Sequence, residues 1–339
     1  MHVGKKFSLG EALLWTRRDI YKFLVLATIP VILYDQLHWK WLSLPWLPIA
    51  LIGTAVAFLV GFKNNATYDR LWEARKIWGA IVNSSRTWGI MTMDFVTNKH
   101  ATMKLSDDDL KRVHQRIIYR HLGWITALRF QLRQSRSWES MTHSYNKEYS
   151  KLYSVPEYET KMEDILSTFL SEDELKQILK KKNAATQIIV HQSKELKELL
   201  DQGLIDDFRH MELQNVLADL YDHQGKCERI KNFPYPRQFA TLNLYFIWLF
   251  ILLLPFGMLQ EFSKLGAGVV WLTIPFSTLV AWVFHTLEKI GEATENPFQG
   301  GANDIPMASL ARTIEIDLRE MLNEKTIPSP IEPVKDILM

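Results

Sequence analysis

Cysteine and net charge are both nearly absent from this 339-residue sequence. The single cysteine, Cys227, excludes an intrachain disulfide and indicates a reducing environment around that residue. A formal net charge of +2 provides no strong field for nucleic acid or for an acidic partner. Strand-like alternation of useful length, internal repeats and a glycine-rich phosphate loop are also missing. We therefore expect an all-α fold without a nucleic-acid partner.

Patterns typical of catalysis and metal binding are equally scarce. His114 and His121 lie seven residues apart on one helix face, but no carboxylate or third ligand follows at metal-site spacing. The Ser84-Ser85-Arg86 segment lacks the glycines of a nucleophile elbow. Only His285 remains as a candidate, since an ionisable group inside an apolar run can be functional. We expect no enzyme activity, no cofactor and no metal.

Long apolar runs are what the sequence does contain. Three of them have no Asp, Glu, Lys or Arg in 22 residues, namely 41–62, 239–260 and 265–286. A helix needs about 20 apolar residues to cross a bilayer, so these three qualify. A fourth run, 20–37, qualifies if Lys22 snorkels and Asp35 lies at the far interface. A signal peptide is the competing interpretation, but no small-residue cleavage site follows this run.

The basic residues around these runs predict the orientation of the chain. Lysine and arginine precede the first run and crowd the long middle segment, whereas the two short links between neighbouring runs are nearly free of them. Positive residues stay on the cytoplasmic side of a membrane. We therefore expect a multi-pass protein of the inner (plasma) membrane with both termini in the cytoplasm.

The rest of the chain is predicted to form one unit with the membrane helices, so that residues 1–339 make a single subunit. The cytosolic part comprises a helical region, 63–235, and a C-terminal region, 287–339. Ser106 is a candidate helix cap before an apolar periodicity at three- and four-residue steps. That periodicity comprises Leu110, Val113, Ile117, His121, Ile125, Leu128 and Leu132.

The apolar run 41–62 contains two sets of residues spaced four apart, and each set would form a stripe along one side of a helix. The small stripe is Gly53, Ala57 and Gly61, and the neck stripe is Thr54, Phe58 and Phe62. Small residues allow another helix to approach closely in lipid. The neck stripe has two interpretations, which are lipid-facing bulk and the lining of a pore that closes when water leaves it.

A polar segment, 64–75, follows this run without an obvious break. It holds Asn64, Asn65, Asp69, Arg70, Glu73 and Arg75. Because such groups cannot stay unpaired in hydrocarbon, we expect one helix that crosses the membrane and continues into the cytosol. There Trp72, Trp78 and Trp88 would supply bulk against other helices, and Arg70 and Glu73 would pair at i, i+3.

Two separate motifs resemble the bestrophin family, specifically its bacterial branch. They are GFKNNATYDRLWEARKIWGAIVNSSR, residues 61–86, and ENPFQGGANDIP, residues 295–306. The resemblance extends over nearly the whole chain. It implies a homopentamer in the lipid bilayer, with a single central pore that conducts small monovalent ions passively.

The resemblance also implies roles for individual residues. Counting back from Asp69-Arg70 places the three positions of the family's narrow neck at Thr54, Phe58 and Phe62. A second constriction at the cytosolic end of the pore falls at Ile205 or Phe208 when the sequences are aligned on Pro236.

This sequence departs from the family in two places. Many relatives have Arg-Trp-Trp where this chain has Arg70-Leu71-Trp72. Animal bestrophins hold calcium with an acidic run after the position of Phe298, but that segment here carries one carboxylate, Asp304. The equivalent residues are Asn296, Pro297, Phe298 and Asp304. Calcium prefers six to eight oxygen ligands, so we expect no calcium activation at this segment.

The sequence thus predicts a passive channel, and by its family the permeant ion is chloride or another anion. A channel of the same fold that is selective for monovalent cations is the alternative, because an apolar neck carries no charge. A transporter or a membrane scaffold without catalytic activity is a further alternative, although the inverted repeats of transporters are not visible.

Overall fold

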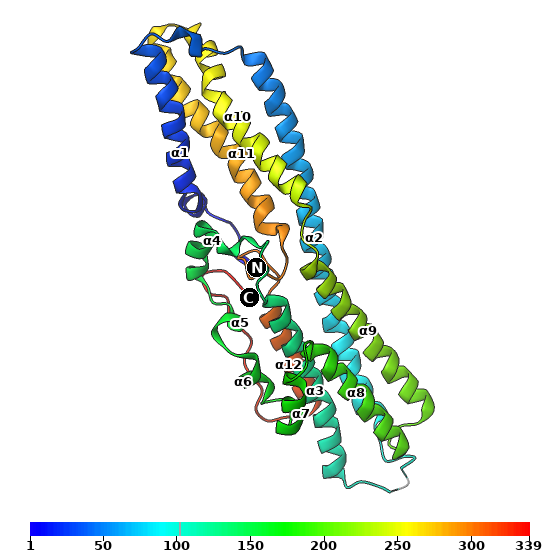
Figure 1. The fold of residues 1–339 in the computed structure, drawn as a ribbon. Helices are drawn as coiled ribbons and strands as arrows, with labels where there is room; N and C mark the ends of the chain where they lie inside the picture. Colours follow the sequence, from blue (N-terminus) through cyan, green and yellow to red (C-terminus); the bar gives the residue numbers. More distant parts are fainter. Residues whose placement is uncertain (102) are drawn as a thin grey trace.

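The computed structural model describes residues 1–101 and 103–339, which are mostly helical (Figure 1). The α-helices are α1 (Leu9–Asp35), α2 (Trp46–Phe95), α3 (Asp107–Arg133), α4 (Ser144–Tyr149), α5 (Pro156–Glu159), α6 (Met162–Leu166), α7 (Glu172–Leu179), α8 (Ala184–Asp201), α9 (Asp207–Asn232), α10 (Arg237–Ser263), α11 (Thr273–Glu295) and α12 (Met307–Met321). Short 3₁₀ helices are η1 (Lys40–Leu42), η2 (Ser140–Thr142), η3 (Ser150–Leu152) and η4 (Ala267–Leu272).

The molecule is elongated, with two helical bundles stacked end to end (Figure 1). One bundle contains α1, α10, α11 and the first half of α2, and the other contains α3, α8, α9, α12 and the second half of α2. The two chain ends lie close together near the level where the bundles meet. Helix α2 runs through both bundles and connects them.

Helix α2 has 50 residues in one continuous helix, which at 1.5 Å per residue makes it about 75 Å long. The apolar run 41–62 therefore continues into the polar segment 64–75 without a break, as the sequence predicts. A helix of this length can cross a bilayer and still extend far beyond it.

Helix ends differ from the expected runs most clearly at three places. Helix α2 starts at Trp46, five residues after the start of the run 41–62, because the 3₁₀ helix η1 and Pro45 precede it. Helix α1 starts at Leu9, well before the run 20–37, because Ser8 and Glu11 form a capping box at its N-terminus. Helix α11 starts at Thr273 because the 3₁₀ helix η4 precedes it, and Gly266 with a φ of 124° separates η4 from α10.

The cap of α3 is confirmed. The Ser106 hydroxyl oxygen accepts a hydrogen bond of 3.1 Å from the backbone N–H of Asp109. Three aspartates occupy the first turn of this helix, where the helix dipole favours negative charge.

Among the described residues, three helices are long and apolar enough to cross a membrane, and they contain α2, α10 and α11. Helix α1 is as long as α10, but its first half carries Arg17, Arg18 and Asp19. It packs against α11 and α10 in the same bundle.

Close packing holds together the bundle of α1, α10, α11 and the first half of α2, which is called the membrane bundle below. At Gly53 of α2, a Cβ atom would lie 2.6 Å from the ring of Phe250 in α10, so a larger residue there would force the two helices apart. Val56, Val60 and Ile247 extend this buried contact along both helices.

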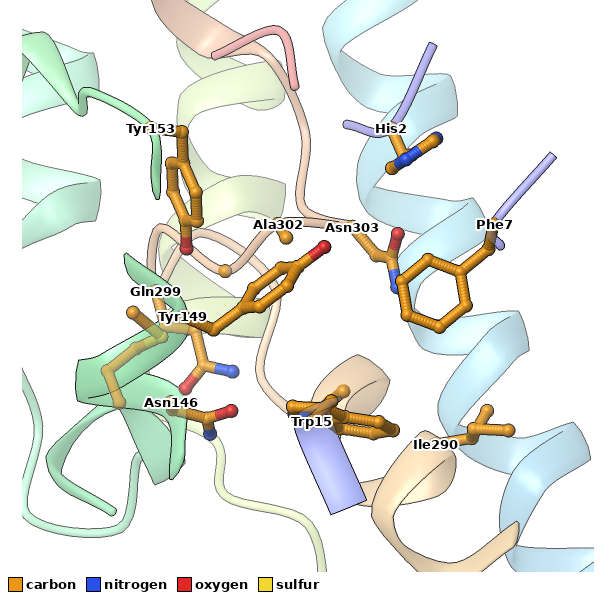
Figure 2. A pocket seen from close by; sticks show the side chains of 13 residues that line it. His2, Phe7, Trp15, Asn146, Tyr149, Tyr153, Ile290, Gln299, Ala302 and Asn303 are labelled. Carbon is orange, nitrogen blue, oxygen red and sulfur yellow. The ribbon is translucent and has the colours of Figure 1, made fainter. Parts of the chain in front are cut away.

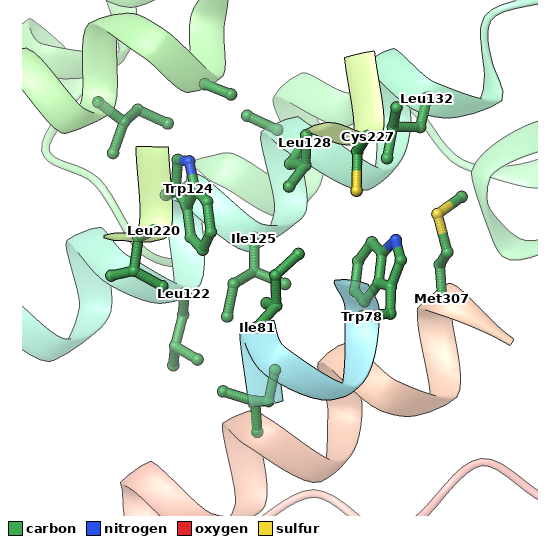
Figure 3. Close-up of a cluster of buried hydrophobic side chains, with 14 of the residues drawn as sticks. Trp78, Ile81, Leu122, Trp124, Ile125, Leu128, Leu132, Leu220, Cys227 and Met307 are labelled. Atoms are coloured by element: carbon green, nitrogen blue, oxygen red, sulfur yellow. The ribbon is translucent and has the colours of Figure 1, made fainter. Parts of the chain in front are cut away.

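The bundle of α3, α8, α9, α12 and the second half of α2 has its own core (Figure 3). Figure 3 shows Trp78 of α2 and Trp124 of α3 on opposite sides of the cluster, with Met307 of α12 beside Trp78. The indole N–H of Trp124 donates to Gln224 of α9 over 2.9 Å, which satisfies its buried donor. Trp78 and Trp88 are both fully buried, which confirms that they supply bulk against other helices.

Candidate functional site

The neck stripe lies on a face of α2 that the described part of the chain leaves uncovered. Phe58 is 66% exposed and Phe62 is 70% exposed, and Thr54 is also exposed. The Thr54 hydroxyl donates to the carbonyl of Ala50 over 3.0 Å, so its polar hydrogen is satisfied within the helix. The opposite face of α2 packs against α10 and α11. A single chain therefore presents two phenylalanine side chains outward, one turn apart.

The small stripe divides between two environments. Gly53 is buried against Phe250, whereas Ala57 and Gly61 are exposed. A Cβ atom at Gly61 would meet nothing within 4 Å among the described residues. Ala57 and Gly53 line a hollow of about 690 Å³ between α2, α10 and α11. Within one chain, Gly53 is the member of this stripe that lets two helices approach.

Charge begins on α2 with a buried ion pair to α11. The Nζ atom of Lys63 bonds to Oε1 of Glu288 and lies 3.9 Å from Oε2 of Glu295. The next residue, Asn64, donates from its Nδ2 atom to the carbonyl of Leu287 over 3.1 Å. These contacts join the two helices at the level where the apolar run of α2 ends.

Helix α11 approaches α2 very closely at Gly291. A Cβ atom there would overlap Oδ1 of Asn64, so the contact requires glycine at this position. One turn farther along, the hydroxyl oxygens of Thr67 and Thr294 are 3.0 Å apart. The first residues of the polar segment are thus helix contacts to α11.

Arg70 and Glu73 contact α9, and the expected i, i+3 pair between them is wrong. The Nη2 atom of Arg70 donates to the carbonyls of Ile230, over 2.7 Å, and Phe233. Glu73 accepts a hydrogen bond of 2.6 Å from Arg229. The last carbonyls of a helix lack partners within that helix, and Arg70 supplies donors for them at the end of α9.

Other residues of the polar segment remain on the surface of the chain. Asn65 and Asp69 are exposed, and Arg75 is partly exposed. Trp72 is half-exposed and stacks on Tyr68, with ring centroids 6.5 Å apart and an angle of 6° between the planes. Trp72 therefore lies outside the core that contains Trp78 and Trp88.

The segment equivalent to the calcium clasp folds around its single carboxylate. Oδ1 of Asp304 accepts from the backbone N–H of Phe298 over 2.8 Å, and Oδ2 accepts from that of Gly300 over 2.7 Å. Oδ2 also pairs with Nη1 of Arg133 over 2.7 Å. Asn296 and Pro297, which begin the segment, are buried.

The partners of Asp304 leave it poorly suited to a cation. Arg133 is fully buried, and burial lowers the pKa of its guanidinium. The negative charges of Asp304 and Glu157 more than offset this effect and raise the pKa overall, so the guanidinium stays charged beside the carboxylate. The described residues contain no group of three or more histidine, cysteine, aspartate or glutamate side chains that could hold a metal ion.

A small cavity of about 90 Å³ lies beside this segment (Figure 2). Figure 2 shows Phe7 and Trp15 from the N-terminal part of the chain and Tyr149 around it, with Asn303 of the segment beside Phe7. The hydroxyl of nearby Tyr153 donates to the carbonyl of Gly300 over 3.0 Å. The segment is thus enclosed by aromatic residues that come from two other parts of the chain.

The two candidates for the cytosolic constriction occupy opposite environments. Ile205 is 2% exposed and packs in a core cluster with Trp88 and Leu217. Phe208, in the first turn of α9, is 81% exposed. An aperture needs a side chain that projects from the subunit, which Phe208 does in the single chain.

The histidines and the cysteine singled out in the sequence are structural or peripheral. His114 hydrogen-bonds through Nε2 to the carbonyl of Val96 over 2.8 Å. His285 lies 3.5 Å from Asp19 of α1. Cys227 is fully buried in the core that contains Trp78 and Trp124, and burial raises the pKa of its thiol, which keeps it protonated and unreactive.

Sequence reasoning did not identify the acidic residues of α11 as partners of the polar segment. Glu288, Glu292 and Glu295 follow one another at i, i+4 and i+7, a spacing that places them on one helix face. They also line a polar cavity of about 610 Å³ where α1, α10 and α11 meet the loop before α4. That spacing was the available signal, because three carboxylates near a membrane helix require partners.

Comparison with known protein families and structures adds to this geometry. The chain matches the family described as "Bacterial/Fungal Bestrophin protein" over residues 18–320. It is similar to the voltage-dependent anion channel-forming protein YneE of Escherichia coli (strain K12), with 26% identity over 84% of this chain and 80% of the relative. It is also similar to the voltage-dependent anion channel-forming protein RSc3414 of Ralstonia nicotianae, with 26% identity over 90% of this chain and 87% of the relative.

Solved structures share the fold. A crystal structure of a bacterial bestrophin homolog from Klebsiella pneumoniae superposes with a TM-score of 0.73 and 24% identity, covering 91% of this chain and 98% of that one. A crystal structure described as that of a membrane protein superposes with a TM-score of 0.75 and 23% identity, covering 92% of this chain and 100% of that one.

Proposed function

The chain belongs to the bacterial/fungal bestrophin family, and from this membership we propose that five copies of it form a passive ion channel around one central pore. Two relatives are named anion channel-forming proteins, which supports chloride or another small anion as the permeant ion. A channel has no reaction to catalyse, which agrees with the scarcity of catalytic patterns in the sequence.

The exposed neck stripe of α2 is the observation that carries this proposal. Phe58 and Phe62 alone would suit contact with lipid. The same face continues into Asn65, less than one turn beyond Phe62, and then into Asp69, about two turns beyond Phe62. Both residues are exposed. An amide and a carboxylate on a membrane helix are tolerated where they face water or a partner. A stripe that changes from apolar to polar at this level suits a pore that widens into the cytosol.

Five such stripes around a common axis would form a narrow hydrophobic neck. Apolar constrictions stop ions by excluding the water that hydrates them, so Phe58 and Phe62 would be the gate. Thr54 would form the outer ring, where its hydroxyl makes the wall more polar. The edges of phenylalanine rings carry partial positive charge, which favours anions when ring edges face the axis.

The topology that fits this pore has four spans in each subunit. They would be α1, the first half of α2, α10 and α11. Both termini and the bundle of α3, α8, α9 and α12, called the cytosolic bundle, would lie on the inner side of the plasma membrane. The concentration of lysine and arginine in the cytosolic bundle supports this orientation. Residues 1–339 would act as one subunit, because α2 runs through both bundles.

A second constriction at the cytosolic end would be formed by Phe208. Its side chain is 81% exposed in the single chain, whereas Ile205 contributes to the core. Because α9 packs along α2, the first turn of α9 lies far from the membrane bundle (Figure 1). In the proposed channel it would therefore be near the cytosolic end of the pore.

Recording in a planar bilayer with unequal potassium chloride concentrations tests the proposed function. We expect ohmic currents whose reversal potential has the sign of chloride, and particles with the mass of a pentamer in detergent. A reversal potential with the sign of potassium would favour the cation-selective alternative. Saturable turnover would indicate a transporter, and the absence of current would indicate a scaffold; either result would overturn the channel.

A further inference from the structure

Asp69 lies on the same face of α2 as the proposed gate. Because α2 is one continuous helix, its periodicity of 3.6 residues per turn fixes this relationship. Eleven residues separate Phe58 from Asp69, which rotates the side chain by about 20° relative to Phe58 after three full turns. Seven residues separate Phe62 from Asp69, which places the carboxylate about 10 Å farther along the helix.

Asp69 is also free of any partner in the described part of the chain. It is exposed, and it forms no ion pair or side-chain hydrogen bond with a described residue. The adjacent cation, Arg70, is turned toward the end of α9, where it donates to the carbonyls of Ile230 and Phe233. The next cation on this face is Lys76, about 10 Å beyond Asp69. Lys63, which directly follows Phe62, is buried against Glu288, so Asp69 is the first exposed charge on this face beyond the neck.

We propose that the Asp69 carboxylates, one from each subunit, form an acidic ring on the cytosolic side of the neck that sets the cation-to-anion permeability ratio of the channel. This inference rests on the proposed pore and names a residue that adjusts its selectivity. The ring attracts cations and repels anions at the inner mouth of the neck.

The distance between the ring and the gate makes this influence effective. The Debye length is about 8–10 Å at physiological ionic strength, so a charge about 10 Å from Phe62 still acts on ions at the inner end of the neck. Charges of one sign that line a confined passage produce potentials of several kT. The neck stripe itself has no formal charge, so an acidic ring beside it lowers the anion concentration at its inner end and limits the preference for chloride that the phenylalanine ring edges provide.

The test is the permeability ratio of reconstituted channels in a potassium chloride gradient. Asp69→Asn removes the charge and is expected to raise the chloride-to-potassium permeability ratio at least about threefold. Asp69→Glu keeps the charge and is expected to leave the ratio near that of the wild type. Asp173→Asn, an equal charge change on exposed α7, is the matched control and is expected to have no effect. The effect of Asp69→Asn should shrink as the salt concentration rises.

Chemical modification gives a second readout that does not depend on the asparagine variant. The only native cysteine, Cys227, is fully buried, so Asp69→Cys introduces the only accessible thiol. A negatively charged methanethiosulfonate reagent should restore the wild-type ratio in that variant. A positively charged one should raise chloride permeability above that of the unmodified variant. Should Asp69→Asn fail to assemble, this pair of reagents decides the question within one assembled channel.

The outcomes separate this inference from the proposed function. If the ratio is unchanged by Asp69→Asn or by either reagent, while Phe58→Ala raises conductance, the acidic ring is wrong and the pore remains. If neither Phe58→Ala nor the changes at Asp69 alter the currents, α2 does not line the pore and both proposals fail. A wild-type protein that passes no current also overturns both.

Discussion

Lys63 of α2 and Glu288 of α11 form an ion pair whose side chains are only 5% and 6% exposed. The second carboxylate oxygen of Glu288 accepts a hydrogen bond of 2.6 Å from Asn243 of α10. Three helices of the membrane bundle are thus tied together at the level where α2 changes from apolar to polar. The pair explains how a membrane helix acquires charge without leaving that charge unpaired.

We predict that breaking this pair destabilises the subunit. Lys63→Met leaves Glu288 buried and without its cation, which we expect to lower the free energy of unfolding by roughly 3–5 kcal/mol. Thermal unfolding of the detergent-solubilised protein measures the change. The double variant Lys63→Met with Glu288→Leu should recover much of the loss, because it removes both charges.

An exposed pair provides the control for this prediction. Lys264 and Glu261 pair over 2.7 Å, with side chains 58% and 42% exposed. Lys264→Met should cost less than about 1 kcal/mol, because water screens exposed pairs. Equal effects of Lys63→Met and Lys264→Met would show that the buried pair does not hold the bundle together.

We predict that truncating either proposed gate residue opens the pore. Phe58→Ala or Phe62→Ala widens the hydrophobic neck and lets water remain in it, so conductance or open probability should rise several-fold. Single-channel recording measures both quantities. Leu59→Ala, on the same helix but rotated by about 100° from Phe58, is the control and should leave the currents unchanged. Wild-type currents in both phenylalanine variants would refute the neck.

We predict that His121 makes the fold sensitive to acid. Its ring lies between Trp88 and Trp124, with centroid distances of 6.1 and 5.3 Å, and burial lowers its pKa to about 3. The unfolded chain binds this proton near the ordinary histidine pKa of about 6.5. The contribution of neutral His121 to stability is therefore complete above pH 6.5 and is lost as the pH falls from about 6.5 toward 3.

The variant His121→Phe should weaken this acid sensitivity. Free energies of unfolding measured from neutral pH down to about two units below the ordinary histidine pKa should fall less steeply in the variant than in the wild type. His100→Phe replaces an exposed histidine and should leave the slope unchanged. Parallel curves for His121→Phe and the wild type would show that other groups cause the acid loss.

We predict that Asp304 stabilises its segment and does not serve calcium. Its carboxylate accepts from three backbone N–H groups and pairs with buried Arg133. Asp304→Asn should lower the free energy of unfolding by about 3 kcal/mol, because it leaves the Arg133 charge without this partner. Wild-type currents should stay constant across a micromolar calcium titration.

The surface residue Asp222, which pairs with Lys226, is the control for stability. Asp222→Asn should change the unfolding transition little, because both groups are solvated. Steep activation of wild-type currents by micromolar calcium would contradict the assignment of Asp304 to a purely structural role.

Local patterns were sufficient to predict several elements. The charge-free run that contains the neck stripe and the polar segment after it predicted one continuous helix, and α2 extends from Trp46 to Phe95. Ser106 predicted the start of α3, and the long sequence motifs predicted the bestrophin family, which the match over residues 18–320 confirms. Each of these features depends on residues that are neighbours in the sequence.

Contacts between distant segments were not predictable in the same way. Arg70 and Glu73 looked like partners because they lie one turn apart, but Arg70 contacts the carbonyl of Ile230, which is 160 positions away. The separation of buried Ile205 from exposed Phe208 likewise depends on how α9 packs against α2.

By itself, the sequence determined which segments are helical, which of them suit a membrane and which family the chain belongs to. These properties follow from composition, helical period and distinctive motifs within short stretches of chain. Only the tertiary structure decided the partners of Lys63 and Arg70 and left Asp69 without one among the described residues. The physical reason is that an ion pair needs two charges within a few ångströms, and packing of helices far apart in the chain sets that distance.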